Sequence, residues 1–308
     1  MKNENYLKKS EVSLVSIGMP VYNGEKFIRK RLDSILEQTF SDFELIISDN
    51  GSTDTTSVIC KEYQIRDKRI RYIRQEKNMG ITWNYNFVLK EAKCNYFIWA
   101  QVDDIWLPTF LEKNVMVLES NQNIVCSMCK IDFYNIDNPE NNSNHLTIKG
   151  FLRKISQSIR PNIYPTSGTY DKKVRCFLKG GHVEVLYGLY RTKNLNSSTV
   201  HEQFIGNDWA TVLSVLKQGD FHIISDILMH GAVTGNSSKG MVNLSRLYGN
   251  GILGIIFPWY YFTSWCRRNI GIKVFLKNLD FFIQLNLEGQ ISLLIDFIQS
   301  LKKIMLGK

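Results

Sequence analysis

The sequence lacks several patterns that would each assign it to a familiar class of protein. Its six cysteines are scattered over 308 residues without a disulfide framework, which fits a reducing compartment. Its five histidines show no metal-ligand spacing, and no internal repeat is present. The first eleven residues are charged and contain no apolar stretch of a signal peptide. We therefore expect a globular cytoplasmic protein.

Two short motifs are incomplete. Cys126 and Cys129 have the spacing of half a zinc site, but no second pair follows, and we expect them on opposite faces of a strand. The glycines of GNGILG, residues 249–254, match a dinucleotide-binding pattern without the strand that should precede it. Neither motif therefore predicts a site.

The net charge of +9 is compatible with nucleic acid, an anionic membrane surface or phosphorylated substrates. Charge alone does not distinguish these partners. No recognised nucleic-acid module and no interleaving of aromatic and basic residues is present, so we expect no nucleic-acid partner.

Between residues 12 and 134, short apolar runs alternate with amphipathic stretches. The pattern predicts strands at 12–20, 43–49, 70–74, 95–101 and 124–134, and helices at 25–38, 54–65, 81–92 and 108–120. This order indicates an α/β fold with a mainly parallel sheet covered by helices on both faces. Polar clusters follow four of the strands, at the edge where such sheets bind ligands: PVYNG, SDNGSTD, KNMG and VDD.

The SDNGSTD stretch follows a buried strand. Gly51 permits a tight turn, and Ser52, Thr53 or Asp54 can cap the next helix, which leaves the carboxylate of Asp49 spare. Capping is one reading of the stretch. The other is that Asp49 accepts a hydrogen bond from the ring N–H of a nucleobase.

Asp103 and Asp104 form a pair of adjacent carboxylates after another strand. Such a pair repels itself, and a divalent cation that bridges to phosphate oxygens stabilises it. The alternative, a helix cap ahead of Pro108, needs only one acid.

Asp208 lies at a predicted helix start, next to Trp209. A first-turn acid is favoured by the helix dipole, which is the simpler reading. In the functional reading, Asp208 is a general base and the aromatic neighbour is one wall of a sugar site.

Three stretches together carry a family resemblance: residues 17–54, KNMGITWNYN and AQVDDIW. They closely resemble family 2 glycosyltransferases, enzymes of the GT-A fold that use nucleotide-activated sugars. The resemblance covers residues 12–235. It implies a GT-A, Rossmann-like domain with a helical C-terminal extension. The expected division is a tail at 1–11, a GT-A domain at 12–238 with a nucleotide-binding half (12–134) and an acceptor-side half (135–238), and an aromatic-rich extension at 239–308.

The resemblance implies roles for individual residues. The nucleotide site comprises Pro20, Tyr22, Asn23, Asp49, Asn50, Asn78, Gly80, Asn86 and Asp103. Asp104, with Asp103, would hold Mg²⁺ or Mn²⁺, and Asp208 would be the catalytic base. Acceptor or sugar contacts are expected from Trp106, His182 and Trp209.

The chain departs from the family pattern at two places. Asn50 stands where the family usually has a second acid. The Arg-x-His element of many members is absent, with Ala232 and Thr234 near the expected positions. Its contacts would fall to His230, Ser237 or Lys239.

The implied function is inverting transfer of a sugar from a nucleoside-diphosphate sugar to a hydroxyl group on a glycan or lipid-linked acceptor. Surface polysaccharide, lipid-linked glycan and glycoprotein biosynthesis all fit. The departures keep open a degenerate nucleotide-sugar or glycan-binding protein. A sugar-nucleotide pyrophosphorylase would need a Gly-rich, basic loop after the first strand, where this chain has PVYNGEKF.

Residues 247–266 are uncharged and are followed by Arg267 and Arg268. The length permits a membrane span, but Pro258, the glycines and the basic residues beyond speak against one. The two favoured alternatives are a helix packed on the core and a helix lying in the interface of an anionic membrane at its cytoplasmic face, and the span is the third.

Overall fold

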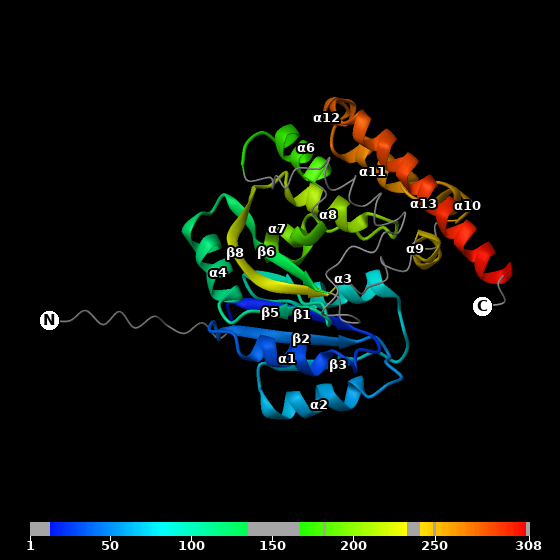
Figure 1. Cartoon of the computed structure of the whole chain (residues 1–308). Coiled ribbons are helices and arrows are strands. Elements are labelled where there is room, and N and C mark those ends of the chain that lie inside the picture. Colours follow the sequence, from blue (N-terminus) through cyan, green and yellow to red (C-terminus); the bar gives the residue numbers. More distant parts are fainter. Residues whose placement is uncertain (1–12, 135–166, 181–182, 233–240, 249–250, 306–308) are drawn as a thin grey trace.

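The computed structural model describes residues 13–134, 167–180, 183–232, 241–248 and 251–305 (Figure 1). His182, Thr234, Ser237 and Lys239 lie outside these residues.

The described strands form one eight-stranded mixed sheet in the order β3-β2-β1-β4-β7-β6-β8-β5. Parallel pairs join β1 to β2 and β4, β2 to β3, and β6 to β8. β7 pairs antiparallel with β4 and β6, and β5 pairs antiparallel with β8. The predicted mainly parallel sheet is confirmed. The strands are β1 (Val15–Val21), β2 (Phe43–Asp49), β3 (Ile70–Arg74), β4 (Tyr96–Trp99), β5 (Ile105–Trp106), β6 (Ile124–Tyr134), β7 (Leu189–Arg191) and β8 (Asp220–Ala232).

Helices cover both faces of this sheet, as the alternating pattern predicted (Figure 1). Those of the first half are α1 (Ile28–Leu36), α2 (Thr56–Arg66), α3 (Ile81–Glu91) and α4 (Phe110–Ser120). The second half contains α6 (Tyr170–Gly180), the 3₁₀ turn η1 (Val183–Tyr187), α7 (Thr192–Asn196) and α8 (Asn207–Val215).

Two apolar clusters fill the two sides of the sheet. One lies among β1, β2, α1 and α4, and the other among α3, α6, α8 and the C-terminal helices. Cys126 belongs to one cluster and Cys129 to the other, so they lie on opposite faces of β6 as expected. Burial raises the pKa of both thiols, that of Cys129 to about 12, which keeps them protonated. Both residues are buried core side chains.

The C-terminal extension packs on the same core as the second half of the sheet domain. Its helices are α9 (Met241–Tyr248), α10 (Gly251–Ile256), α11 (Tyr260–Asn269), α12 (Ile272–Lys277) and α13 (Leu279–Met305). The uncharged stretch 247–266 is divided between the end of α9, α10 and α11, with a turn around Pro258, and Phe262 and Trp265 are buried. Of this stretch, α11 thus packs on the core, whereas Ile252, Leu253, Ile255 and Ile256 of α10 are 49–75% exposed, and the described residues do not form one straight helix.

Candidate active site

Asp49, at the end of β2, is bound to the turn that follows it and to the neighbouring strand β3. The N–H of Ser52 donates to Asp49 Oδ1 at 2.8 Å, and the hydroxyl of Tyr72 donates to Asp49 Oδ2 at 2.7 Å. Asp49 is fully buried. The expectation that its carboxylate is spare is therefore wrong, because it already stabilises the turn and the neighbouring strand; its contact with a base stays a prediction.

Asn50 ties the end of β2 to the loop before α3. Its amide donates to Asn78 Oδ1 at 2.9 Å and to the Gly80 carbonyl at 3.2 Å, and its Oδ1 accepts the Met79 N–H at 2.9 Å. Gly51 has φ +72°, and a Cβ there would lie 2.9 Å from the backbone of Lys77. The two predicted loops, SDNG and KNMG, are therefore brought together as one surface.

Asn23 connects the first polar cluster to the second. Its φ is +51°, its Oδ1 accepts the Thr53 N–H at 2.8 Å, and its own N–H donates to Ser52 Oγ at 2.9 Å. Pro20 is buried in β1, whereas Tyr22 is exposed beside this junction. The structure thus places these residues at the expected strand edge.

Asp103 and Asp104 follow β4, in the turn before β5. Asp104 is only 6% exposed, and burial raises its pKa to about 6; the charge of Asp103 acts in the same direction, and Arg31 and the Ala232 N–H act against it. That N–H donates to Asp104 Oδ1 at 3.3 Å. Oxygen ligands whose negative charge is destabilised by burial suit a hard divalent cation.

Within the described ranges, no group of three or more His, Cys, Asp or Glu side chains could hold a metal ion. Sites for Mg²⁺ often use one or two carboxylates and complete the coordination shell with water and substrate phosphates. The pair Asp103 and Asp104 fits that donor set.

Trp106 was expected to contact sugar, and the structure contradicts this. The side chain is 2% exposed and stacks on Phe110 with ring centroids 4.6 Å apart, while the Arg31 guanidinium lies 3.9 Å from the ring centroid. Trp106 pairs in β5 with Met229 of β8, which turns the ring into the core. Its role is to fix the turn that carries the two acids.

In the region where many family members have the Arg-x-His element, a backbone N–H of this chain contacts the acid pair. Ala232 supplies its backbone N–H to Asp104, as described above. His230 pairs with Ile105 across the strands, and its Nδ1 lies 3.4 Å from Asp132 Oδ2, an ion pair only when the imidazole is protonated.

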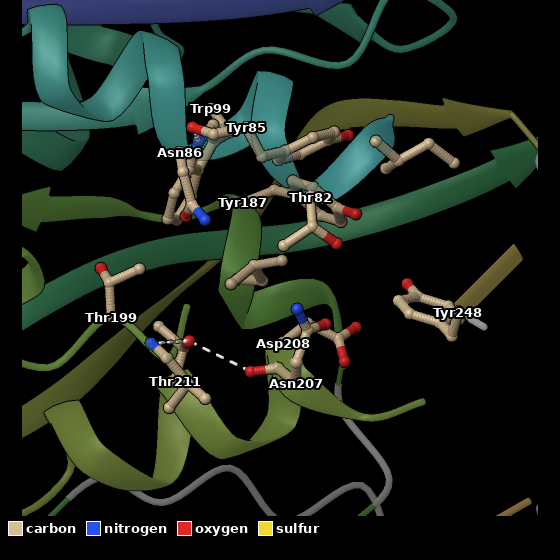
Figure 2. Close-up of a pocket in the computed structure, with 13 residues that line it drawn as sticks. Thr82, Tyr85, Asn86, Trp99, Tyr187, Thr199, Asn207, Asp208, Thr211 and Tyr248 are labelled. Atoms are coloured by element: carbon tan, nitrogen blue, oxygen red, sulfur yellow. Dashed lines mark hydrogen bonds between the residues drawn. The ribbon is translucent and has the colours of Figure 1, made fainter. Parts of the chain in front are cut away.

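Asp208 lies in the first turn of α8 and lines a pocket of about 130 Å³. Figure 2 shows Thr82, Tyr85 and Asn86 of α3 on one side of this pocket and Asn207, Asp208 and Thr211 of α8 on the other. Burial raises the pKa of Asp208 to about 6, opposed by the Trp209 N–H, which donates to Asp208 Oδ1 at 2.9 Å. A carboxylate with this pKa is poised to accept a proton near neutral pH.

Trp209 does not form a wall of the pocket, contrary to expectation. It is buried, and its ring packs against Phe177, Trp259, Phe262 and Phe281 at centroid distances of 6.0, 5.3, 5.7 and 6.4 Å. Successive residues of a helix point about 100° apart, so Asp208 and Trp209 face different surroundings. Trp209 anchors the C-terminal extension instead.

Three tyrosines of the pocket were not predicted. Tyr85 comes from α3, Tyr187 from η1 and Tyr248 from the end of α9 (Figure 2). Burial raises the pKa of all three. The charges of Asp103 and Asp104 add to the effect at Tyr85, and that of Asp208 adds to it at Tyr187 and Tyr248.

The three tyrosines line the same pocket as Asp208. Tyr85 precedes the predicted Asn86, which also lines the pocket. Tyr187 lies in the largely apolar run VLYGLY, residues 185–190, whereas no local pattern marks Tyr248.

This sheet, with two strand-end acids and a third acid facing a pocket, defines a GT-A-like glycosyltransferase fold, as expected. The chain belongs to glycosyl transferase family 2, whose family model matches residues 16–175.

The curated relatives share only part of their length with this chain. An uncharacterized glycosyltransferase of Methanocaldococcus jannaschii is 39% identical over 113 residues, 36% of this chain and 39% of that protein. Glycosyltransferase GlyA of Streptococcus pneumoniae is 41% identical over 93 residues, 30% of this chain and 13% of the relative. The matched part therefore spans well under half of each relative.

Solved structures resemble most of the chain at low identity. TarS 1-349 of S. aureus, in complex with UDP-GlcNAc, has a TM-score of 0.55 at 18% identity and covers 89% of this chain and 81% of its own. Mannosyltransferase PcManGT of Pyrobaculum calidifontis, in complex with GDP-Man and Mn²⁺, has a TM-score of 0.58 at 12% identity and covers 95% and 76%. These likenesses establish the fold.

Proposed function

We propose that this protein transfers a sugar, with inversion at the anomeric carbon, from a nucleoside-diphosphate sugar to a hydroxyl acceptor. The observation that carries the proposal is that Asp208 lines a pocket together with three tyrosines. The charges of Asp103 and Asp104 act on the same pocket, because they raise the pKa of Tyr85, and that of Asp104 also raises the pKa of Tyr187. The neighbours solved with UDP-GlcNAc and with GDP-Man support a nucleotide-sugar donor.

The donor would lie along the strand ends. Asp49 and the loop fixed by Asn50 would hold the base and ribose, and Asp103 and Asp104 would hold Mg²⁺ or Mn²⁺ at the diphosphate. A bound divalent cation supplies positive charge that neutralises the departing nucleoside diphosphate. The Mn²⁺ in the PcManGT structure supports this assignment.

The acceptor would enter the pocket from the side of α8. Asp208 takes the proton of its hydroxyl as the oxygen attacks the anomeric carbon, and the bond to the diphosphate breaks. One displacement inverts the centre, so no carboxylate nucleophile is required. Tyr85, Tyr187 and Tyr248 offer ring faces and hydroxyls of the kind that hold a sugar.

The geometry weakens the case for a degenerate binding protein. Asn50 donates two hydrogen bonds that an aspartate could not donate, so the missing acid is explained by the loop it holds.

The test is a donor screen of the purified chain with UDP-, GDP- and dTDP-sugars and a panel of methyl glycosides as acceptors, measuring released nucleoside diphosphate. We expect one donor to be turned over with a divalent cation, and no turnover after EDTA treatment. Donor binding without release from any donor would favour the binding-protein alternative.

A further inference from the structure

The C-terminal extension carries most of the exposed large apolar side chains in the described part of the chain. Of 26 such side chains, 17 lie between Leu247 and Leu301. On α13, one set follows spacings of three and four residues, which places its members on one helix face about 33 Å long. This apolar stripe consists of Leu279, Ile283, Leu287, Ile291, Leu294, Ile298 and Leu301.

The opposite face of α13 is fixed to the protein. Phe282 stacks on Phe275 with ring centroids 4.6 Å apart, and a Cβ on Gly289 would lie 2.7 Å from the Trp259 ring. Further along, Asp296 Oδ2 accepts the Met241 N–H at 2.7 Å. The helix is thus held over at least four turns.

These contacts bear on how α13 relates to a membrane. Residues Leu279–Gln299 are long and apolar enough to cross one, with 22% of the most apolar window buried; a single such helix is weak evidence for a span. Because one face is attached to the folded domain, α13 can present only the stripe to an apolar phase. That arrangement matches a helix lying flat in a bilayer interface.

The charge of the extension indicates which surface the stripe meets. Residues 241–308 contain eight Lys and Arg and three acidic residues. All three acids have partners within the protein: Asp280 pairs with Lys179 at 2.8 Å, Asp296 caps α9, and Glu288 accepts a hydrogen bond from the Gln284 amide at 2.7 Å. Arg267, Arg268 and Lys273 are exposed.

A second copy of a chain with net charge +9 would bring like charges together, whereas an anionic lipid surface complements them. We propose that the apolar stripe docks the protein on an anionic lipid bilayer, with α13 lying along the headgroups.

Contacts within the extension connect the stripe to the pocket. Asp296 of α13 accepts the first N–H groups of α9, and α9 ends at Tyr248 in the pocket. The amide of Gln203 also donates to the Leu247 carbonyl at 3.2 Å. Docking of the stripe would therefore hold the pocket close to the lipid surface. We infer that the protein prefers an acceptor anchored in the bilayer, an inference that rests on the proposed function.

The first test is sedimentation of the full chain with phosphatidylcholine vesicles, with and without phosphatidylglycerol. We expect binding at low salt to the anionic vesicles only, and release at high salt. The stripe variant Leu287→Gln/Ile291→Gln/Leu294→Gln should bind at least about tenfold more weakly, because three apolar side chains no longer enter the interface. The control variant Ile65→Gln/Met116→Gln alters side chains that are 86% and 65% exposed on other helices, and should bind as the wild type does.

A charge variant, Arg267→Glu/Arg268→Glu, should retain the fold and lose most of the salt-sensitive binding. Absence of binding at low salt, or equal binding of the stripe variant, would overturn the proposal. A dimer in sedimentation velocity that the stripe variant abolishes, without vesicle binding, would assign the stripe to a second copy instead.

The acceptor step is tested with the acceptor sugar that the donor screen identifies, supplied as a methyl glycoside and as a long-chain alkyl glycoside in vesicles. We expect the wild type to prefer the alkyl form and the stripe variant to lose that preference. Equal turnover of both forms by the wild type would overturn this step and leave vesicle binding standing. Turnover of neither form would refute the proposed function.

Discussion

The first half of this molecule, residues 13–134, and the described residues beyond 167 are held together by different interactions. Within residues 13–134, polar side chains at strand ends bond to one another, as Asn50 does to the loop around Asn78. Beyond residue 167, aromatic rings from distant segments pack together, with Trp209 at their centre. The first kind of interaction leaves short motifs in the sequence. The second leaves none, because each partner lies tens of residues away.

The largest effect should come from the acid pair of the first half. Asp104→Asn should lower transfer by about a thousandfold and weaken cation-dependent donor binding. The fold should persist, because the neutral amide avoids burying a carboxylate whose pKa is already raised to about 6. Nucleoside diphosphate release and thermal unfolding measure the two effects, and substantial activity of this variant would remove Asp104 from the cation site.

The aromatic centre of the second half is tested by Trp209→Ala. Removing this buried ring should cost about 3–5 kcal/mol of unfolding free energy. Denaturant unfolding measures the loss, with the exposed Ile65→Ala as a control expected to change stability little. If Trp209→Ala proves as mild as the control, the contrast between polar and aromatic halves would not hold.

Asp208 lines the pocket and the adjacent Trp209 packs in the core, so substitution of Asp208 should affect catalysis rather than stability. Asp208→Asn should lower kcat by about a hundredfold or more with donor affinity unchanged. It should also leave stability intact or raise it, because a carboxylate whose pKa is raised by partial burial is replaced by a neutral group. An equal loss of donor binding, measured by titration calorimetry, would instead move Asp208 to the nucleotide site.

The pH dependence of the wild type follows from the same carboxylate. Asp208 accepts a proton only when ionised, and its pKa is raised to about 6. Below that pH, kcat/KM should fall about tenfold per unit as the protonated form accumulates, and above it the rate should level off. A profile flat down to pH 4, where the fold is still intact, would exclude this residue as the base.

The smallest effect should come from Asn50→Asp, which restores the acid of the family pattern. The carboxylate cannot donate to Asn78 Oδ1 or the Gly80 carbonyl and would repel both oxygens. We expect donor affinity to fall about fivefold, since one or two modest hydrogen bonds are lost. Met79→Leu, a change at an exposed side chain in the same loop, serves as the control. Unchanged donor affinity in Asn50→Asp would show that donor binding does not depend on the hydrogen bonds that Asn50 donates to this loop.

Much of the first half could be predicted from sequence. The bounds expected for β2, β3 and β6 agree with the structure, because apolar runs flanked by turn residues mark buried strands. The polar clusters also lie at one sheet edge, since the carboxyl ends of parallel strands meet there. The two-residue β5 escaped prediction because it is too short to show a pattern.

Less of the candidate site could be predicted where aromatic residues were involved. Trp106 and Trp209 follow acids in the chain, and adjacency was taken as a shared surface. The 100° helical step instead turns the Trp209 ring away from Asp208 and into the core, and the Trp106 ring is buried by its stacking on Phe110. Tyr248 reaches the pocket only through tertiary packing of α9, which no local pattern reports.

Gly206 joins the sheet domain to the C-terminal extension at the point where α8 begins. Its φ is +89°, and a Cβ there would lie 2.9 Å from the Trp259 ring and 3.1 Å from that of Phe262. The residue that lets the chain turn into the helix of Asp208 is thus also the contact point for α11. Exchanging the extension for that of a relative would therefore disturb the backbone two residues before Asp208, the proposed base. A chimera intended to change acceptor preference should move α8 and α11 as one unit.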